Sequence, residues 1–178
     1  GYKVRCFGYY KEYLAIGTTK GSTITEQDAG RIYFWDGIAS TYNFFVDVPE
    51  GGINALLGAK GKLFVWAGYQ GDLLVYSGGD STEQVKRVPL LESTKYMEVY
   101  PSAVTMWRML VRFGVAGGSD SDTLQKGVYT WGSQNIRYPD SLSYDYPIST
   151  GTLGTNAKIG LVTVVNKKLL IGYQDNVS

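Results

Sequence analysis

The segment Lys62-Leu63-Phe64-Val65-Trp66-Ala67-Gly68, followed by Asp72-Leu73-Leu74-Val75-Tyr76-Ser77-Gly78, decides the fold of this chain. Both parts are short apolar runs that end in glycine, and similar pairs of runs occur at residues 13–37 and 110–132. A fourth copy begins at 168–177. The marker glycines of the four copies are spaced 51, 46 and 58 residues apart: Gly17, Gly68, Gly114 and Gly172. A period of about 40–50 residues built from short strands is typical of β-propeller blades.

Each copy is expected to form a four-stranded antiparallel sheet, because its runs are rich in Tyr, Val, Ile, Phe and Trp and are separated by turn residues. The predicted strands are 4–9, 13–17, 31–35 and 42–47; 53–59, 62–67, 72–76 and 85–90; 103–107, 109–113, 127–131 and 142–148; and 159–165 and 168–172. The sequence therefore predicts one all-β, propeller-like domain with an incomplete ring. Its blades span about 1–50, 51–98 and 99–155, with a partial blade at 156–178.

The third strand of each copy supports stacked sheets. Alternate residues point to opposite faces of a strand, and in these strands both sets are largely apolar. Such strands should be covered on both faces, as neighbouring blades would do. A β-sandwich or barrel is the alternative. Three aromatic residues should occupy equivalent, buried places at the ends of these strands: Trp35, Tyr76 and Trp131.

The composition disfavours several classes of function. The 178 residues carry 17 Lys and Arg against 16 Asp and Glu, without the clustered basic field that nucleic acid would require. The chain contains no histidine, which removes the usual general base and metal ligand. Its one cysteine, Cys6, is expected to be a small buried hydrophobe. No apolar run is long enough for a membrane helix, and the sequence predicts no cofactor.

The connections between the second and third strands alternate in length. They are long at 18–30 and 115–126 and short at 69–71, so the two long loops should project from the same face. Long polar loops on a rigid scaffold often bind partners, although they can also be tolerated surface insertions. The candidate binding residues in these loops are Thr18, Lys20, Glu26, Asp28, Ser119, Asp120, Asp122 and Lys126.

The sequence predicts neither catalytic nor metal-binding residues. The alternating Asp residues at 118–122 resemble the start of a calcium loop, but the later Gly and Glu are missing and a solvated turn is favoured. No pair of acids stands out for glycoside hydrolysis. An aromatic sugar-binding platform is a further possibility, weighed against packing in the core, for four residues: Trp131, Tyr138, Tyr144 and Tyr146.

The repeated sequence pattern at 30–37 and 62–78, with weaker copies at 108–132 and 168–177, resembles the propeller-like repeats of structural proteins in tailed-bacteriophage virions. The resemblance implies a non-enzymatic tail, tail-tip or fibre-associated module in the virion. Its loops would contact neighbouring virion proteins, the rest of its own chain, or a host-surface protein or glycan. The alternative is an extracellular propeller that binds or cleaves carbohydrate.

Residues 168–172 should form an exposed sheet edge, a liability that proteins normally cover. We therefore expect another part of a longer chain, or a neighbouring subunit, to pair with this edge. On its own, the chain should aggregate or be poorly soluble.

Overall fold

The computed structural model describes residues 1–21, 29–68, 71–79, 85–88, 97–117, 127–135, 137–147 and 158–174. The chain divides into two compact units, Gly1–Tyr96 and Met97–Ser178. Both are built from antiparallel strands, so the all-β prediction is confirmed. Within the described ranges the one helix is a single 3-10 turn, η3 (Pro101–Ala103). No helix in that part of the chain is long and apolar enough to cross a membrane.

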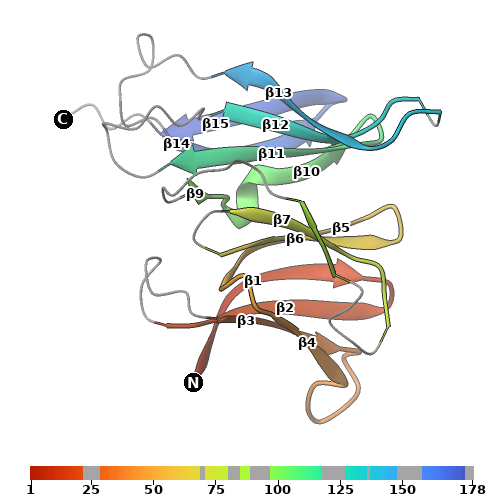
Figure 1. Ribbon diagram of the computed structural model, residues 1–178, viewed down its shortest axis with the longest axis vertical. Helices are drawn as coiled ribbons and strands as arrows, with labels where there is room; N and C mark the ends of the chain where they lie inside the picture. Colours follow the sequence, from red (N-terminus) through yellow and green to blue (C-terminus); the bar gives the residue numbers. More distant parts are fainter. Residues whose placement is uncertain are drawn as a thin grey trace. The chain divides into compact units, whose positions relative to one another are not determined.

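The first unit contains two four-stranded sheets, which Figure 1 draws in red to orange and in yellow to green. The strands of the first sheet follow one another in chain order: β1 (Tyr2–Tyr10), β2 (Tyr13–Lys20), β3 (Ala29–Trp35) and β4 (Phe44–Val48). The second sheet has the same order: β5 (Ile53–Ala59), β6 (Lys62–Ala67), β7 (Asp72–Tyr76) and β8 (Val85–Val88).

The second unit contains the third and fourth sheets. The third sheet is formed by β10 (Val104–Trp107), β11 (Leu110–Gly117), β12 (Gly127–Gly132) and β13 (Ser141–Pro147), and the short β9 (Met97–Glu98) also pairs with β11. The fourth sheet is the hairpin of β14 (Lys158–Val165) and β15 (Lys168–Gln174).

Most predicted strands match these within a few residues, but the long loops are shorter than predicted. β2 continues to Lys20 and β3 begins at Ala29, so the ends of the predicted 18–30 loop belong to the sheet. The ladder continues because Thr18 pairs with Arg31 and its neighbours follow in register. Similarly, β11 continues to Gly117, beyond the start of the predicted 115–126 loop. Thr18, Thr19 and Val115 were assigned to loops, but all three are buried strand residues.

The pairing registers correct the sequence repeat at one position. Each sheet begins with a hairpin whose second strand starts at residue 13, 62, 110 or 168. Counting four residues on reaches Gly17, Gly114 and Gly172, but in the second sheet it reaches Trp66 rather than Gly68. Gly68 instead lies after β6 with a φ of 76°, in the left-handed region that favours glycine. Gly17 and Gly68, which the predicted repeat treats as equivalent, therefore have different structural roles.

A β-bulge in the first strand supports this corrected alignment. The register shifts between Val4 and Cys6, between Ile53 and Ala55, and between Ile159 and Leu161. Directly after the bulge, the partner residue is Gly17, Trp66 or Gly172. We call the sheet face that carries this position the glycine face.

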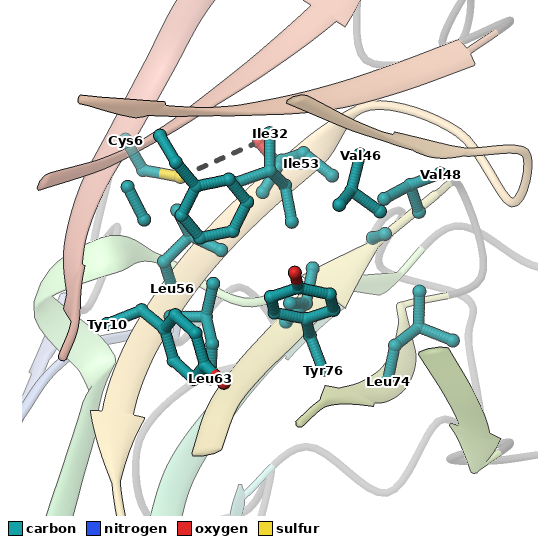
Figure 2. Close-up of a cluster of buried hydrophobic side chains, with 14 residues drawn as sticks. Cys6, Tyr10, Ile32, Val46, Val48, Ile53, Leu56, Leu63, Leu74 and Tyr76 are labelled. Atoms are coloured by element: carbon teal, nitrogen blue, oxygen red, sulfur yellow. Dashed lines mark hydrogen bonds between the residues drawn. The ribbon is translucent and has the colours of Figure 1, made fainter. Parts of the chain in front are cut away.

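The core of the first unit lies between the glycine face of the first sheet and the opposite face of the second. Figure 2 shows much of this cluster, in which Cys6 and Ile32 lie near Ile53 and Leu56. The cysteine is buried as predicted, and burial raises its thiol pKa to about 12. The buried members are Cys6, Tyr10, Ala15, Ile32, Phe34, Val46, Val48, Ile53, Leu56, Leu63, Val65, Ala67, Leu74 and Tyr76.

The second unit buries a smaller cluster with the same geometry. Val128 of the third sheet packs with Ile159 and Val162 of the fourth, and Ala103 completes the cluster. By register, Val128 corresponds to Ile32, while the two residues of the fourth sheet correspond to Ile53 and Leu56.

One contact is common to both units, because glycine lets an isoleucine of the next sheet approach the backbone. A Cβ at Gly17 would lie 2.7 Å from Ile53 Cγ2, and a Cβ at Gly114 would lie 2.3 Å from Ile159 Cγ2. Neither position has room for a side chain. Each unit is therefore a pair of sheets that stack the glycine face of one on the opposite face of the next.

Candidate functional site

The outer face of the first sheet, which points away from the second sheet, is exposed and apolar. The bulge between Val4 and Cys6, followed by period-2 alternation, brings Val4, Phe7 and Tyr9 to this face, and they are 57%, 60% and 72% exposed. Tyr42 and Phe45 extend it, and both are exposed. Large contiguous apolar surfaces of this kind usually mark an interaction site.

A groove of about 490 Å³ lies on this face. It crosses the sheet from β1 to the connection between β3 and β4. Its lining residues are Tyr2, Val4, Ile16, Thr18, Tyr33, Trp35, Ala39, Ser40, Thr41 and Tyr42. The volume lies within the range of small-molecule sites.

One wall of the groove is a loop held by Asp36. Its Oδ1 accepts hydrogen bonds from the backbone N–H groups of Ile38 and Ala39, each at 2.9 Å, and Asn43 Nδ2 donates to Oδ2 at 2.9 Å. These three bonds, led by the one from Ala39, hold the carboxyl pKa of Asp36 below its usual range. Trp35 Nε1 also donates to the Ala39 carbonyl, at 2.7 Å. The loop is thus fixed to the end of β3 before any partner binds.

Arg31 organises the aromatic residues beside the groove. Its guanidinium carbon lies 3.9 Å from the ring centre of Phe45, 4.9 Å from that of Tyr2 and 5.8 Å from that of Tyr33. Two hydrogen bonds to Asp47, at 2.6 and 3.2 Å, complete its contacts. The bond to Asp47 raises the pKa of Arg31, so the side chain stays charged and its charge is paired.

The groove offers aromatic surfaces and hydroxyl groups. None of its ten lining residues carries a carboxylate, amine, thiol or imidazole. Its chemistry is therefore that of apolar contact and neutral hydrogen bonding, which suits a protein side chain or a sugar ring.

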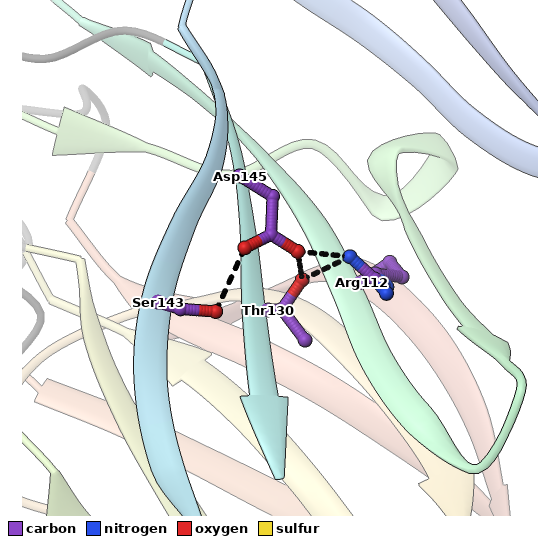
Figure 3. A network of polar contacts seen from close by, with 4 residues as sticks. All are labelled: Arg112, Thr130, Ser143 and Asp145. Atoms are coloured by element: carbon purple, nitrogen blue, oxygen red, sulfur yellow. Dashed lines mark hydrogen bonds and ion pairs between the residues drawn. The ribbon is translucent and has the colours of Figure 1, made fainter. Parts of the chain in front are cut away.

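A second polar cluster lies on the glycine face of the third sheet (Figure 3). Arg112 Nη1 donates to both Thr130 Oγ1 and Asp145 Oδ2, Thr130 also donates to Asp145, and Ser143 Oγ donates to Asp145 Oδ1 at 2.8 Å. Asp145 reaches this face because the pairing of β12 with β13 has a bulge there.

Burial opposes ionisation of Asp145, but the bonds from Thr130 and Ser143 and the charge of Arg112 outweigh it. The pKa of Asp145 therefore lies below its usual range. Since the Arg112 side chain is only 7% exposed, this cluster neutralises a buried cation. Among the residues that the structure describes, no three of His, Cys, Asp and Glu gather as metal ligands.

The structure describes two of the predicted binding residues. Thr18 is a buried strand residue rather than a loop residue, its hydroxyl donates to the Arg31 carbonyl at 2.8 Å, and it lines the groove. Lys20 is exposed at the end of β2. The other six lie outside the described residues: Glu26, Asp28, Ser119, Asp120, Asp122 and Lys126. A role in binding for all eight remains a prediction.

The three aromatic repeat positions are equivalent, as predicted. Trp35 pairs with Leu14, Tyr76 with Leu63 and Trp131 with Val111. Each of these partners is the second residue of the second strand in its sheet's first hairpin. Their burial differs: Tyr76 is buried, whereas the two tryptophans are only partly buried. Burial is complete for Tyr76, while the partly buried Trp35 lines the groove.

The aromatic platform considered for the third sheet is divided. Tyr144 stacks on Tyr129, with ring centres 4.8 Å apart, and burial raises the pKa of Tyr129 to about 12. Tyr138 and Tyr146 are exposed, at 68% and 45%. Tyr144 is therefore engaged in packing.

The groove was not predicted from the sequence. Its signal was present: the residues that alternate in β3 with buried Ile32 and Phe34 include Tyr33 and Trp35, and Asp36 follows directly. Both faces of this strand were predicted to be covered, but the face that carries Tyr33 and Trp35 is open. The pairing of Asp36 with Asn43 depends on loop geometry that alternation does not encode.

Comparison with known proteins adds no family, since no protein-family model and no curated protein sequence matches this chain.

Proposed function

We propose that this protein is a non-enzymatic interaction module of a larger protein assembly and that the outer face of its first sheet docks a neighbouring protein. The observation that carries the proposal is the exposure of Val4, Phe7 and Tyr9 side by side on one sheet face. Exposed apolar side chains that lie next to one another are costly to leave in water. The rigid aromatic rings around Arg31 add contact area at low entropic cost.

The architecture that we propose is propeller-like, with an incomplete ring. Two observations support it: apart from β9, each sheet has its strands in chain order, and both units stack a glycine face on the opposite face of the next sheet. Blades of a propeller repeat this stacking around a central axis.

The resemblance to virion repeats makes a phage tail, tail-tip or fibre the assembly that we favour. Docking through an apolar sheet face suits such a role, since this face would be permanently covered in the assembled particle. Neighbouring virion proteins are then the partners, with a host-surface molecule as a further one.

A second candidate function is carbohydrate binding in an extracellular protein. It is favoured by the groove itself, in which Tyr2, Tyr33, Trp35 and Tyr42 lie around Ser40 and Thr41. Aromatic rings stack on the apolar faces of sugars, and hydroxyl groups can bond to their edges. A glycan array with the full chain separates the candidates, since saturable glycan binding that Trp35→Ala abolishes would favour the second.

The leading proposal is tested by light scattering of the full chain over a range of concentrations. The wild-type chain should associate, and Phe7→Asp should suppress association because it places a charge on the outer face. The matched control is Met109→Asp, at a residue that is 62% exposed in a hairpin turn of the second unit and that adopts a φ of 65°, which Asp tolerates. A wild-type chain that stays monomeric at high concentration would refute the proposal.

A further inference from the structure

Both units contain the same contact, between a glycine of one sheet and an isoleucine of the next. A residue equivalent to each of these two also lies on an exposed surface. Inside the units, Gly17 receives Ile53 and Gly114 receives Ile159. The glycine face of the fourth sheet carries the next glycine in this series, Gly172. The outer face of the first sheet carries Val4, which occupies the same register position before its bulge as the two isoleucines.

The glycine face of the fourth sheet is open and apolar. Gly172 pairs with Leu161, and the neighbouring pairs on the same face are Thr163 with Leu170 and Val165 with Lys168. Val165 and Leu170 are each 49% exposed. At Gly17 and Gly114 an isoleucine of the next sheet lies within 3 Å of the Cβ position, whereas at Gly172 the closest atoms all belong to Leu161 of the same hairpin.

The outer face of the first sheet has the complementary form. Val4 is a β-branched residue that is 57% exposed, and Phe7 corresponds by register to Leu56, which is buried in the first unit. Within each unit, the residues that correspond to Val4 and Phe7 lie on the later sheet and pack on the glycine face of the earlier one. They are Ile53 and Leu56 in the first unit, and Ile159 and Val162 in the second.

We propose that copies of this protein associate head to tail, with the glycine face of the fourth sheet of one copy stacked on the outer face of the first sheet of another. Val4 of one copy would approach Gly172 of the other, as Ile53 approaches Gly17. This inference rests on the proposed function and names the occupant of the docking face: a second copy of this chain. An interface between two different faces is heterologous, so association continues into chains or closed rings rather than stopping at a symmetric dimer.

The test combines two variants that each block one face, Val4→Asp and Leu170→Asp. Either variant alone should be monomeric, because an unpaired carboxylate would have to be desolvated in the interface, and each should weaken association about tenfold or more. An equimolar mixture should form a one-to-one dimer that does not grow. In that dimer, the intact outer face of Leu170→Asp meets the intact glycine face of Val4→Asp. Analytical ultracentrifugation of the full chain measures all three samples.

Other outcomes overturn the inference in distinguishable ways. If Val4→Asp blocks association but Leu170→Asp does not, the outer face docks a protein surface other than the fourth sheet; the proposed function stands and the head-to-tail pairing fails. A mixture that remains monomeric also overturns the pairing. A wild-type chain that is monomeric throughout counts against both proposals. Circular dichroism checks the folding of each variant, and Phe7→Asp and Val165→Asp provide second blocks of the two faces.

Discussion

The two units make the same sheet-to-sheet contact but fill the space beside it with opposite chemistry. In the first unit, Phe34 lies on the glycine face and stacks on Phe44, with ring centres 4.6 Å apart. By register, Thr130 and Ser143 take these two places in the second unit, where they bind Asp145 and, through Thr130, Arg112. An aromatic core in one unit is a charged network in the other.

This difference indicates what defines the repeat. The glycine and the branched residue that approaches it recur, because they set how closely two sheets stack. The surrounding side chains can be aromatic or ionic provided that they fill the volume between the sheets. The two solutions should fail differently when they are disturbed, which makes the comparison testable.

The largest effect is expected for Phe34→Ala. Phe34 is fully buried and contacts the rings of Tyr10, Tyr13, Phe44 and Tyr76, so its loss should lower the free energy of unfolding by roughly 3–5 kcal/mol. The equivalent change in the second unit, Thr130→Ala, removes hydrogen bonds to charged groups and should lower it by about 1.5–3 kcal/mol. Urea unfolding at low protein concentration measures both.

The exposed Phe7→Ala is the control for this pair and should alter stability by no more than about 0.5 kcal/mol. Equal losses for Phe34→Ala and Thr130→Ala would contradict the distinction between the aromatic cluster and the charged network.

The next effect tests what the units share. Gly17→Ala and Gly114→Ala should each destabilise by about 1–3 kcal/mol, since the new Cβ overlaps an isoleucine of the next sheet and, at Gly17, also Cys6 Sγ of its own sheet. Gly160→Ala is the matched control, because a Cβ there meets nothing within 4 Å. The loss from Gly17→Ala should be smaller in an Ile53→Ala background, and that from Gly114→Ala smaller in an Ile159→Ala background. Additive losses in these double variants would show that the contact is not the cause.

The charged network of the second unit should be sensitive to acid. Asp145→Asn leaves the buried Arg112 without a counter-charge and should lower stability by about 1–3 kcal/mol at neutral pH, less than for a fully buried pair because Asp145 is 28% exposed. The pKa of Asp145 is lowered in the folded protein. Its contribution is therefore complete above the unfolded value of about 4 and is lost as the pH falls through the folded value.

Unfolding monitored between pH 6 and pH 2 tests this dependence. The wild-type chain should lose stability below about pH 4 more steeply than Asp145→Asn. Parallel pH profiles for the two proteins would exclude Asp145 as a source of the acid sensitivity.

The sequence predicted most strands, because period-2 alternation and turn residues report directly on local backbone structure. In the second sheet, the predicted bounds of β5, β6 and β7 agree with the observed ones. The glycine repeat was predictable at Gly17, Gly114 and Gly172 but wrong at Gly68, since residue type cannot reveal that Trp66 holds the equivalent register position. The groove was missed because its wall depends on Asp36 meeting Asn43 across a loop.

The ion pair beside the groove offers the smallest and most discriminating comparison. Arg31 and Asp47 have the same residue types as Arg112 and Asp145, but their side chains are 23% and 46% exposed. Asp47→Asn should therefore cost less than about 1 kcal/mol, because water already solvates much of the pair and Arg31 keeps its contacts with Phe45 and Tyr2. Molar salt should reduce the difference between this variant and the wild type, while leaving the effect of Asp145→Asn largely intact, since salt screens exposed pairs more than buried ones. A loss for Asp47→Asn as large as that for Asp145→Asn would mean that the aromatic rings alone cannot hold the guanidinium. The outer face would then depend on this ion pair for its shape.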